Sequence, residues 1–308
     1  MATHSLKQKK IGVLAGGWSS EREVSLKSGQ AAAAALASLA YDVVLIDAGH
    51  DLPEQLRQAG VDVALIALHG RGGEDGQVQG VLEVMRIPYS GSGVQACALA
   101  MDKICTKQLL QFHGLATPAF DYLLPDDEQE DLIRRCQGLP VVVKPSCEGS
   151  TVGVSIARTR QQLVDGVAVA AQLNGRLMLE EYIDGAEMTV SIINGRVLPV
   201  IQVLPEGGFY DYRAKYQSTT TRYLVPAPVD AELTEDIQHR ALAAYRHLGC
   251  RGAARVDFIV RGREIFCIEI NTVPGMTETS LLPKAAAAVG ISFAQLVEMM
   301  VNDAGLDR

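Results

Sequence analysis

Two alternating strands around a glycine turn are predicted by the stretch Arg255-Val-Asp257-Phe-Ile-Val-Arg-Gly262-Arg-Glu-Ile-Phe-Cys-Ile-Glu269-Ile-Asn271. If this hairpin is centred near Arg263, Asp257 lies opposite Glu269 and Arg255 lies opposite Asn271. Because side chains repeat every two residues along a strand, these four are expected on one polar face. The opposite face is expected to carry four apolar side chains, those of Val256, Phe258, Ile268 and Ile270.

The polar face of this hairpin is a candidate metal site. Two carboxylates and an amide oxygen beside an arginine suit a hard cation such as Mg²⁺, completed by water and phosphate oxygens. The alternative is a solvated strand face with exposed charges. The turn Asn271-Thr-Val-Pro-Gly275-Met-Thr follows the second strand and supplies backbone N–H groups, which are the raw material of an anion or oxyanion site. This turn favours the functional interpretation.

A second cluster begins with a lysine that ends an apolar run, in Lys144-Pro-Ser-Cys-Glu-Gly149-Ser150-Thr151-Val-Gly153. Such a loop can lay amide N–H groups over phosphates while the ammonium neutralises their charge. The order G-x-x-x-x-G-K-[ST] of a P-loop is missing here, and residues 12–17 do not fit the dinucleotide fingerprint G-x-G-x-x-G. An ordinary turn is the alternative for each glycine loop taken alone.

Apolar runs and helical patterns alternate through the first hundred residues. Strand-like runs occupy residues 11–15, 42–47 and 61–68, and helical patterns occupy residues 23–39 and 77–85. This alternation predicts a parallel sheet covered by helices, with functional loops at the carboxyl ends of the strands. The strand ends at residues 16–21 and 69–76 carry the glycines and charged side chains expected of such loops.

The second half of the chain contains one strong hairpin signal and one long irregular segment. Asn194-Gly195 joins two strand-like runs and predicts a tight hairpin turn. Residues 205–228 contain Gly207-Gly208, four tyrosines and a Ser-Thr run, without sustained periodicity. A loop this long inside a compact domain is usually functional, so we expect a lid over a site, with a disordered insertion as the alternative.

Composition excludes several classes of protein. The 308 residues suffice for two or three domains. A net charge of -8 gives no broad basic footprint for nucleic acid. The apolar segments are too short for a signal peptide or a membrane span, so we expect a cytoplasmic protein with no membrane contact. The six cysteines show no CxxC pair and are expected to be reduced thiols rather than zinc ligands.

Five motifs follow one another along the chain: Gly16-Gly17-x-Ser19-x-Glu21-x-x-Val24-Ser25, Leu68-His69-Gly70-x-x-Gly73-Glu74-Asp75-Gly76, Lys144-Pro145-x-x-x-Gly149-Ser150-x-x-Gly153, Tyr212-x-x-Lys215-Tyr216, and Arg255-x-Asp257 through Glu269-x-Asn271-Thr-x-Pro-Gly-Met-Thr. In this order and at this spacing, the sequence resembles the D-alanine-D-alanine ligases from about residue 10 to its end. These are ATP-grasp enzymes of peptidoglycan precursor synthesis.

The resemblance implies an α/β chain with an ATP-grasp fold and an N-terminal parallel-sheet domain. An N-terminal α/β substrate-binding domain is expected at residues 1–102. A central ATP-grasp subdomain is expected at 103–185, and a C-terminal one at 186–308, with the lid at about 205–228. A homodimer is also expected from the family.

The resemblance further implies an ATP-dependent ligation. The carboxylate of one D-alanine is phosphorylated by ATP, and the amine of a second D-alanine attacks the acyl phosphate. Two Mg²⁺ ions, or Mn²⁺ in their place, are expected to bridge the ATP phosphates. The physical logic agrees, because a carboxylate repels a nucleophile until a good leaving group is attached, and phosphoryl transfer relies on positioning and charge neutralisation.

The family motifs assign the nucleotide site residue by residue. The expected metal ligands are Asp257, Glu269 and Asn271. The expected ATP contacts are Lys103 and Lys144 at the phosphates, with Glu180 and Glu187 at the adenine and ribose. Lys215 on the lid is expected to reach the transferring phosphate.

The motifs also assign the amino-acid sites. Glu21 is expected to bind the ammonium of the first D-alanine and to link the domains through Ser150 and Tyr216. The tetrahedral oxyanion is expected to meet Arg255 and the N–H of Gly275. The carboxylate of the second D-alanine is expected at Ser280 and the N–H of Leu281, and His69 is expected near the first substrate.

Simpler interpretations exist for single residues and for the whole chain. Glu21 could be a helix N-terminal charge favoured by the dipole, His69 a satisfied histidine at a strand end, Lys215 a solvated lysine and Tyr216 lid packing. For the whole chain, the alternatives are another ATP-grasp carboxylate-amine ligase with different substrates, or a non-catalytic nucleotide-binding regulator. The regulator predicts a broken metal triad or a missing Arg255, and the sequence has neither.

Overall fold

A parallel sheet forms the N-terminal part of the computed structural model, which describes residues 6–124, 126–173, 176–205, 221–277 and 280–308. In this sheet, β1 (Lys10–Gly16) lies between β2 (Asp42–Ala48) and β3 (Val63–Ile66). Every residue of β1 after Lys10 is buried, as expected for a parallel strand that is covered on both faces. The parallel sheet predicted from the alternating pattern is therefore confirmed.

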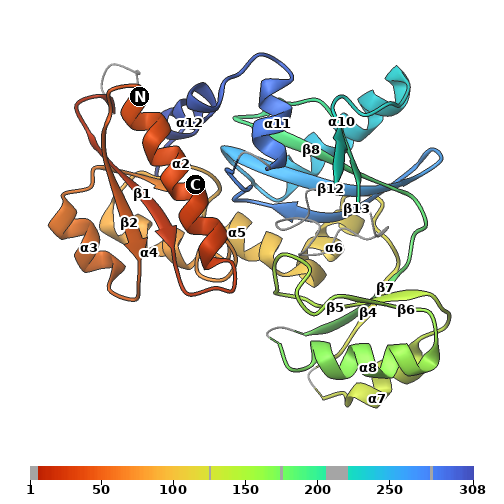
Figure 1. Ribbon diagram of the computed structural model, residues 1–308. Helices are drawn as coiled ribbons and strands as arrows, with labels where there is room; N and C mark the ends of the chain where they lie inside the picture. The colour runs from red at the N-terminus through yellow and green to blue at the C-terminus, as the bar shows by residue number, and fades with distance from the viewer. Residues whose placement is uncertain (1–5, 125, 174–175, 206–220, 278–279) are drawn as a thin grey trace.

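Helices lie on both faces of this sheet (Figure 1). They are α2 (Arg22–Ser38), α3 (Leu52–Ala59), α4 (Gln77–Met85) and α12 (Phe293–Asn302). Ile11 and Val13 of β1 pack with α2 and α12, whereas Leu14 packs with α3 and α4. Odd and even positions of the strand thus point to different helix layers, which is the two-residue periodicity of a strand.

A four-stranded antiparallel sheet forms the middle of the chain. Its strands, in spatial order, are β4 (Phe120–Tyr122), β7 (Leu177–Glu181), β5 (Val141–Pro145) and β6 (Ser155–Ala157). Two helices, α7 (Gln129–Arg135) and α8 (Arg160–Ala170), share a buried apolar cluster with it. A capping box between Thr159 and Gln162 fixes the start of α8. The other face of the sheet is left for the site described below.

A six-stranded antiparallel sheet forms the C-terminal part. Its strands are β8 (Ala186–Ile193), β9 (Arg196–Val197), β10 (Ile201–Leu204), β11 (Arg222–Leu224), β12 (Ala253–Arg261) and β13 (Glu264–Asn271). The helices whose apolar residues share its core are α5 (Val94–Met101), α6 (Lys103–Phe112) and α10 (Ala231–His247). Asn194 and Gly195 form the predicted tight turn between β8 and β9, with φ of 52° and 78°. Strand β11 occupies part of the predicted lid, and residues 206–220 lie outside the described residues.

The hairpin formed by β12 and β13 has the predicted register where it carries its polar residues. Arg255 pairs with Asn271, and Asp257 pairs with Glu269. The register then shifts at a bulge after Asp257, so that Phe258 pairs with Cys267. The prediction that Ile268 faces the apolar side is wrong, because the bulge lets Ile268 line the cavity while Cys267 is buried in the core.

The last helix returns to the N-terminal sheet, whereas the helix before it packs on β8 of the six-stranded sheet (Figure 1). Buried side chains of α11 (Leu281–Ala287) and α12 share one apolar cluster with β1, β3 and the strands β8, β10 and β12. The Tyr41 hydroxyl also donates a 2.8 Å hydrogen bond to Glu298 of α12. The domain boundaries given above remain a prediction, and this cluster joins residues from the first and the last of those segments.

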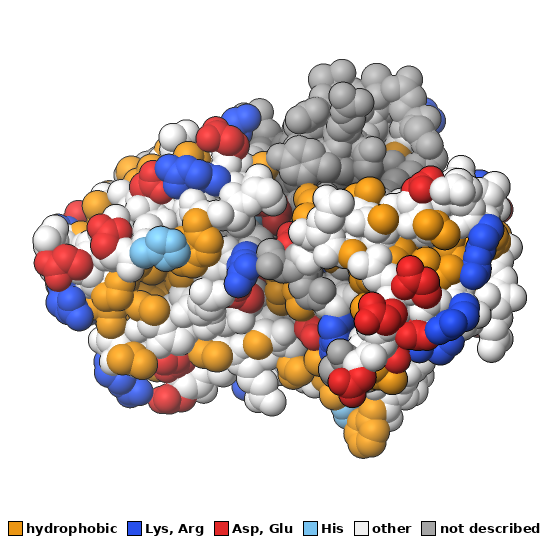
Figure 2. Space-filling model, turned by 90° about the horizontal axis from the view of Figure 1, so that it is seen from below, with side chains coloured by type: hydrophobic (Ala, Val, Ile, Leu, Met, Phe, Trp, Pro, Cys, Tyr) orange, Lys and Arg blue, Asp and Glu red, His pale blue; other side chains and the backbone are white. Residues whose placement is uncertain are grey.

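The surface and the helices carry two further observations. Figure 2 shows acidic and basic side chains interspersed with apolar ones on the described part of one face. Among the described residues, none of the helices combines the length and the apolar character that a bilayer crossing needs.

Candidate functional site

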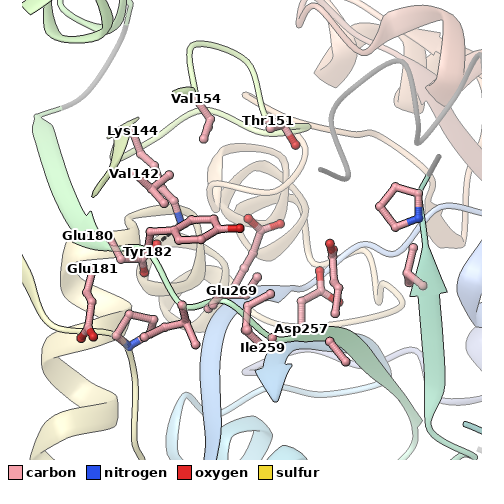
Figure 3. Close-up of a pocket in the computed structure, with 18 of the residues that line it drawn as sticks. Val142, Lys144, Thr151, Val154, Glu180, Glu181, Tyr182, Asp257, Ile259 and Glu269 are labelled. Atoms are coloured by element: carbon pink, nitrogen blue, oxygen red, sulfur yellow. Dashed lines mark ion pairs between the residues drawn. The ribbon is translucent and has the colours of Figure 1, made fainter. Parts of the chain in front are cut away.

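A cavity of about 630 Å³ lies between the four-stranded and the six-stranded sheets (Figure 3). Lys144 and Glu180 enter it from the four-stranded sheet, and Asp257 and Glu269 enter it from the six-stranded sheet. Lys103 and Glu187 complete the set of predicted nucleotide residues that line it. Apolar side chains such as Ile259 lie among these charges, so the cavity offers both an apolar surface and charged groups.

Asp257 is a buried carboxylate of the site that three side chains hold in place. It accepts two hydrogen bonds of 2.8 Å from the Arg255 guanidinium, one of 2.6 Å from the Thr189 hydroxyl and one of 3.1 Å from the Asn271 amide. Only 6% of Asp257 is exposed. These bonds fix the carboxylate at the edge of the cavity, directly across the strand ladder from Glu269.

The donor set on this hairpin fits a hard divalent cation. Asp257 and Glu269 supply carboxylate oxygens from paired positions, and Asn271 supplies an amide whose oxygen and nitrogen can exchange by rotation. Mg²⁺ is usually held by one or two carboxylates, with water and substrate phosphates at its other positions. The described residues contain no cluster of three or more Asp, Glu, His and Cys side chains of metal-binding geometry.

Glu180 is held between two lysines. Its Oε1 accepts a 2.6 Å hydrogen bond from Nζ of Lys107, and its Oε2 forms an ion pair with Lys144. Burial alone raises the pKa of Glu180, but the charges of Lys144 and Lys107 outweigh it and lower the pKa below its ordinary value. The carboxylate is therefore ionised at neutral pH, although only 3% of Glu180 is exposed.

Lys107 is the residue of this group that the sequence analysis missed. Its side chain has no exposed surface, and its Nζ also donates to the Thr117 hydroxyl. A signal was available, because Lys107 falls between Ile104 and Leu110 on the buried side of α6. A lysine at such a position needs a partner, since fully buried lysines are almost always paired.

The loop after β5 brings backbone groups toward the cavity. Ser150 and Thr151 have φ of 50° and 64°, in the left-handed region that non-glycine residues seldom adopt. Lys103 holds this loop by two hydrogen bonds. Its backbone N–H donates to the Ser146 carbonyl, and its Nζ donates to the Glu148 carbonyl at 2.7 Å. Strained backbone of this kind clusters at binding sites, where successive N–H groups can face an anion.

Glu21 and Ser150 bring the N-terminal and middle parts of the chain together. The Ser150 hydroxyl donates a hydrogen bond to Glu21, and both residues are buried. Glu21 follows β1 and immediately precedes α2, whose N-terminus favours a negative charge. The predicted link between these two residues is therefore present, while Tyr216 and Lys215 lie outside the described residues.

His69 connects the parallel sheet to the turn after β13. Its Nε2 lies 3.1 Å from the Ser28 hydroxyl, which accepts a 3.3 Å hydrogen bond from the N–H of Met276. Burial lowers the pKa of His69, but the hydrogen bond and charge of Glu74 and the charge of Glu21 outweigh it, so the pKa is raised. The charge of Glu21 thus acts on His69, and a role of His69 beside the first substrate remains a prediction.

Gly275, Ser280 and Leu281 lie together at the start of α11. The Ser280 hydroxyl accepts a 3.0 Å hydrogen bond from the N–H of Thr277, and Ser280 occupies the N-cap position of α11 without a side-chain capping bond. A Cβ on Gly275 would lie 2.8 Å from the Ser280 hydroxyl, so a larger residue at this position would require the Ser280 side chain to move. A helix start with polar backbone groups is suited to a carboxylate.

Two sequence models of one family match this chain. The model described as "D-ala D-ala ligase C-terminus" matches residues 109–302, and the one described as "D-ala D-ala ligase N-terminus" matches residues 48–92. The D-alanine-D-alanine ligase of Syntrophotalea carbinolica is 51% identical over 308 residues, which is 100% of both chains. The chain belongs to the D-alanine-D-alanine ligase family. Another member, from Desulforudis audaxviator, is 48% identical and covers 96% of this chain and 98% of its own.

Solved structures of the D-alanine-D-alanine ligase family have the same fold. The Bacillus anthracis D-alanine-D-alanine ligase complexed with ATP superposes with a TM-score of 0.83 at 36% identity, and covers 96% of this chain and 97% of its own. The VanG D-Ala:D-Ser ligase of Enterococcus faecalis gives a TM-score of 0.81 at 28% identity, with 96% and 98% covered. The predicted ATP-grasp fold with its N-terminal parallel sheet is confirmed.

Proposed function

We propose that this protein joins two D-alanine molecules, with ATP cleaved to ADP and phosphate, in peptidoglycan precursor synthesis. The observation that carries the proposal is the cavity that the paired carboxylates Asp257 and Glu269 line together with Lys103 and Lys144, in a chain 51% identical over its full length to a D-alanine-D-alanine ligase. A nucleotide placed there has cationic groups for its phosphates and apolar side chains for its base.

The nucleotide end of the site works by charge and position. Lys103 and Lys144 contact the phosphates, Glu180 and Glu187 anchor the adenine and ribose, and Lys215 reaches the transferring phosphate. Asp257, Glu269 and Asn271 would hold Mg²⁺ or Mn²⁺, which supplies neutralising charge at the phosphate oxygens when bound. Phosphoryl transfer needs little else from the protein, because positioning and charge stabilisation supply most of the rate.

The amino-acid end of the site orients the two substrates. Glu21 accepts the ammonium of the first D-alanine, beside His69, and is held by Ser150; Tyr216, outside the described residues, would complete this link. Ser280 and the N–H of Leu281 receive the carboxylate of the second D-alanine. Arg255 and the N–H of Gly275 donate to the oxygen that becomes negative when the amine attacks. Donors of this kind act mainly on the transition state.

The proposal also includes the oligomeric state, the location and the domain division expected from the family. We propose a homodimer in the cytoplasm. Its domains would span residues 1–102, 103–185 and 186–308, with a lid at about 205–228. Ligation of a different second substrate is the competing function, since one of the proteins with the same fold is a D-Ala:D-Ser ligase.

An assay that measures phosphate released from ATP in the presence of Mg²⁺ and candidate substrates tests the proposal. We expect release with D-alanine, none with L-alanine, and no added product with D-alanine plus D-lactate. The same assay with D-alanine plus D-serine, read by mass spectrometry of the dipeptide, separates the competing function. Release with another acid in place of D-alanine would instead identify a different ATP-grasp carboxylate-amine ligase.

A further inference from the structure

The side chain of Lys107 cannot meet a nucleotide directly. Its side-chain exposure is 0%, whereas Lys144 is 11% exposed and lines the cavity. The two ammonium groups contact different oxygens of one carboxylate, that of Glu180. Any influence of Lys107 on the nucleotide therefore passes through Glu180.

The charges of this group do not cancel. Burial lowers the pKa of Lys107, and the negative charge of Glu180 acts against that effect. With Lys107 protonated, two ammonium groups face one carboxylate, so one positive charge is in excess. Without Lys107, the charge of Glu180 would be balanced by Lys144 alone. The Lys144–Glu180 ion pair, which is also present with Lys107 in place, would then carry no net charge and would attract a phosphate only weakly.

We propose that Lys107 is a positioning residue that balances the charge of Glu180 from the buried side, so that the Lys144–Glu180 pair keeps a net positive charge toward the nucleotide phosphates. This inference rests on the proposed function only in assigning ATP to the cavity. The contacts of Lys107 support it, because they hold its ammonium at a fixed point. Thr117 accepts a hydrogen bond from Nζ, and the ring of Phe120 lies with its centroid 5.1 Å away.

Lys107→Met tests the inference, since methionine has a similar length and no charge. Glu180 keeps Lys144 as a partner in this variant, so the chain is expected to fold. Titration with ATP should show affinity weakened by about ten-fold or more, the range for loss of a hydrogen bond to a charged group. Titration with adenosine, which has no phosphates, should change by less than about three-fold.

Two further variants separate this role from a purely structural one. Thr117→Val removes the neighbouring hydroxyl but keeps the ammonium, and should change ATP affinity by less than about three-fold. In a Glu180→Gln background there is no carboxylate charge to balance, so Lys107→Met should change ATP affinity by less than about three-fold there.

Equal weakening of ATP and adenosine binding by Lys107→Met, or the same loss of ATP affinity in the Glu180→Gln background, would overturn the inference. A melting curve of each variant shows which of them remain folded at the titration temperature. Nucleotide binding does not depend on the amino acid that is ligated. ATP binding with no D-alanine ligation would therefore refute the proposed function and leave the role of Lys107 to be decided by these titrations.

Discussion

At the scale of single residues, Arg255 has two possible tasks that one variant separates. It holds Asp257 by two hydrogen bonds of 2.8 Å and is proposed to meet the oxyanion. We expect Arg255→Ala to lower kcat by about 10²- to 10³-fold, because an oxyanion donor acts on charge that develops late. The affinity for ATP should change little, since Thr189 and Asn271 still hold Asp257.

Steady-state kinetics together with direct ATP titration check this prediction. Arg251→Ala is a suitable control, because Arg251 is an exposed arginine just before the same strand. If ATP affinity falls as much as turnover in Arg255→Ala, the arginine serves chiefly to hold Asp257 and the assignment to the oxyanion is incorrect.

His69 gives a prediction about pH at the same scale. Its pKa is raised above the ordinary value of 6.5, since Glu74 and Glu21 outweigh the effect of burial. A raised pKa contributes stability that is fully present below the unfolded-state pKa and is lost as the pH rises through the folded-state pKa. Thermal unfolding should therefore show a larger gap in Tm between the wild type and His69→Gln at about pH 5.5 than at about pH 9. A gap that widens with rising pH would contradict this.

The sequence predicted contacts between particular residues where a motif or a hairpin pattern contained them, while the roles of these residues remain a prediction. The Glu21–Ser150 contact and the pairing of Asp257 with Glu269 are both present. Lys107 was missed because its role depends on its contact with Glu180, which is 73 residues away, and no local motif contains both residues. The spacing of Ile104, Lys107 and Leu110 indicates burial of a lysine but not its partner.

At the scale of secondary-structure elements, two glycines give opposite predictions. Gly195 has a φ of 78° in the turn after β8, whereas Gly80 lies inside the helix α4. At either position, an added Cβ would meet no atom within 4 Å. Gly195→Ala should lower the free energy of unfolding by about 1–2 kcal/mol through left-handed strain alone. Gly80→Ala should raise it by about 0.5–1 kcal/mol, because alanine has less freedom to lose in a helix.

Denaturant unfolding of the two glycine variants checks both signs in one experiment. Each serves as the control for the other, since neither introduces a contact with the rest of the protein. Two changes of the same sign would show that factors other than backbone conformation dominate at one of the sites.

Elements with strong local signals were predicted more reliably than irregularities within them. The Asn194-Gly195 turn requires positive φ at both positions, which the two residue types themselves indicate. The bulge after Asp257 has no comparable signal, since Phe258, Ile268 and Cys267 are all apolar and fit either face. Ile268 was therefore assigned to the wrong side of the sheet.

At the scale of the whole molecule, the shared apolar cluster predicts that distant segments depend on one another. Leu296 of α12 is fully buried in a cluster that also contains residues of β1 and β12. We expect Leu296→Ala to lower the free energy of unfolding by about 2–5 kcal/mol. Hydrogen exchange should show faster exchange in β1 as well as in α12.

Val84→Ala is the matched control for this prediction. Val84 is 86% exposed on α4, so its truncation should change the free energy of unfolding by no more than about 0.5 kcal/mol. Faster exchange confined to α12 in Leu296→Ala would mean that the helix is attached to the N-terminal sheet without supporting it.

The sequence predicted the type of each sheet but not this long-range packing. Alternating patterns identify a parallel sheet and its covering helices, yet they do not say which helix covers which face. The amphipathic pattern of α12 is satisfied by any apolar surface, and only the assembled chain selects the surface beside α2.

The hydrogen bond between Tyr41 and Glu298 spans 257 residues, and it has a consequence for the order of events during synthesis. A ribosome delivers the chain from its N-terminus, so the first sheet emerges long before the helix that covers one of its faces. Ile11, Val13 and Leu36 stay without their final cover until α12 has left the exit tunnel. The apolar face of the nascent N-terminal segment is therefore exposed during much of synthesis, and exposed apolar surface of this kind is what chaperones bind.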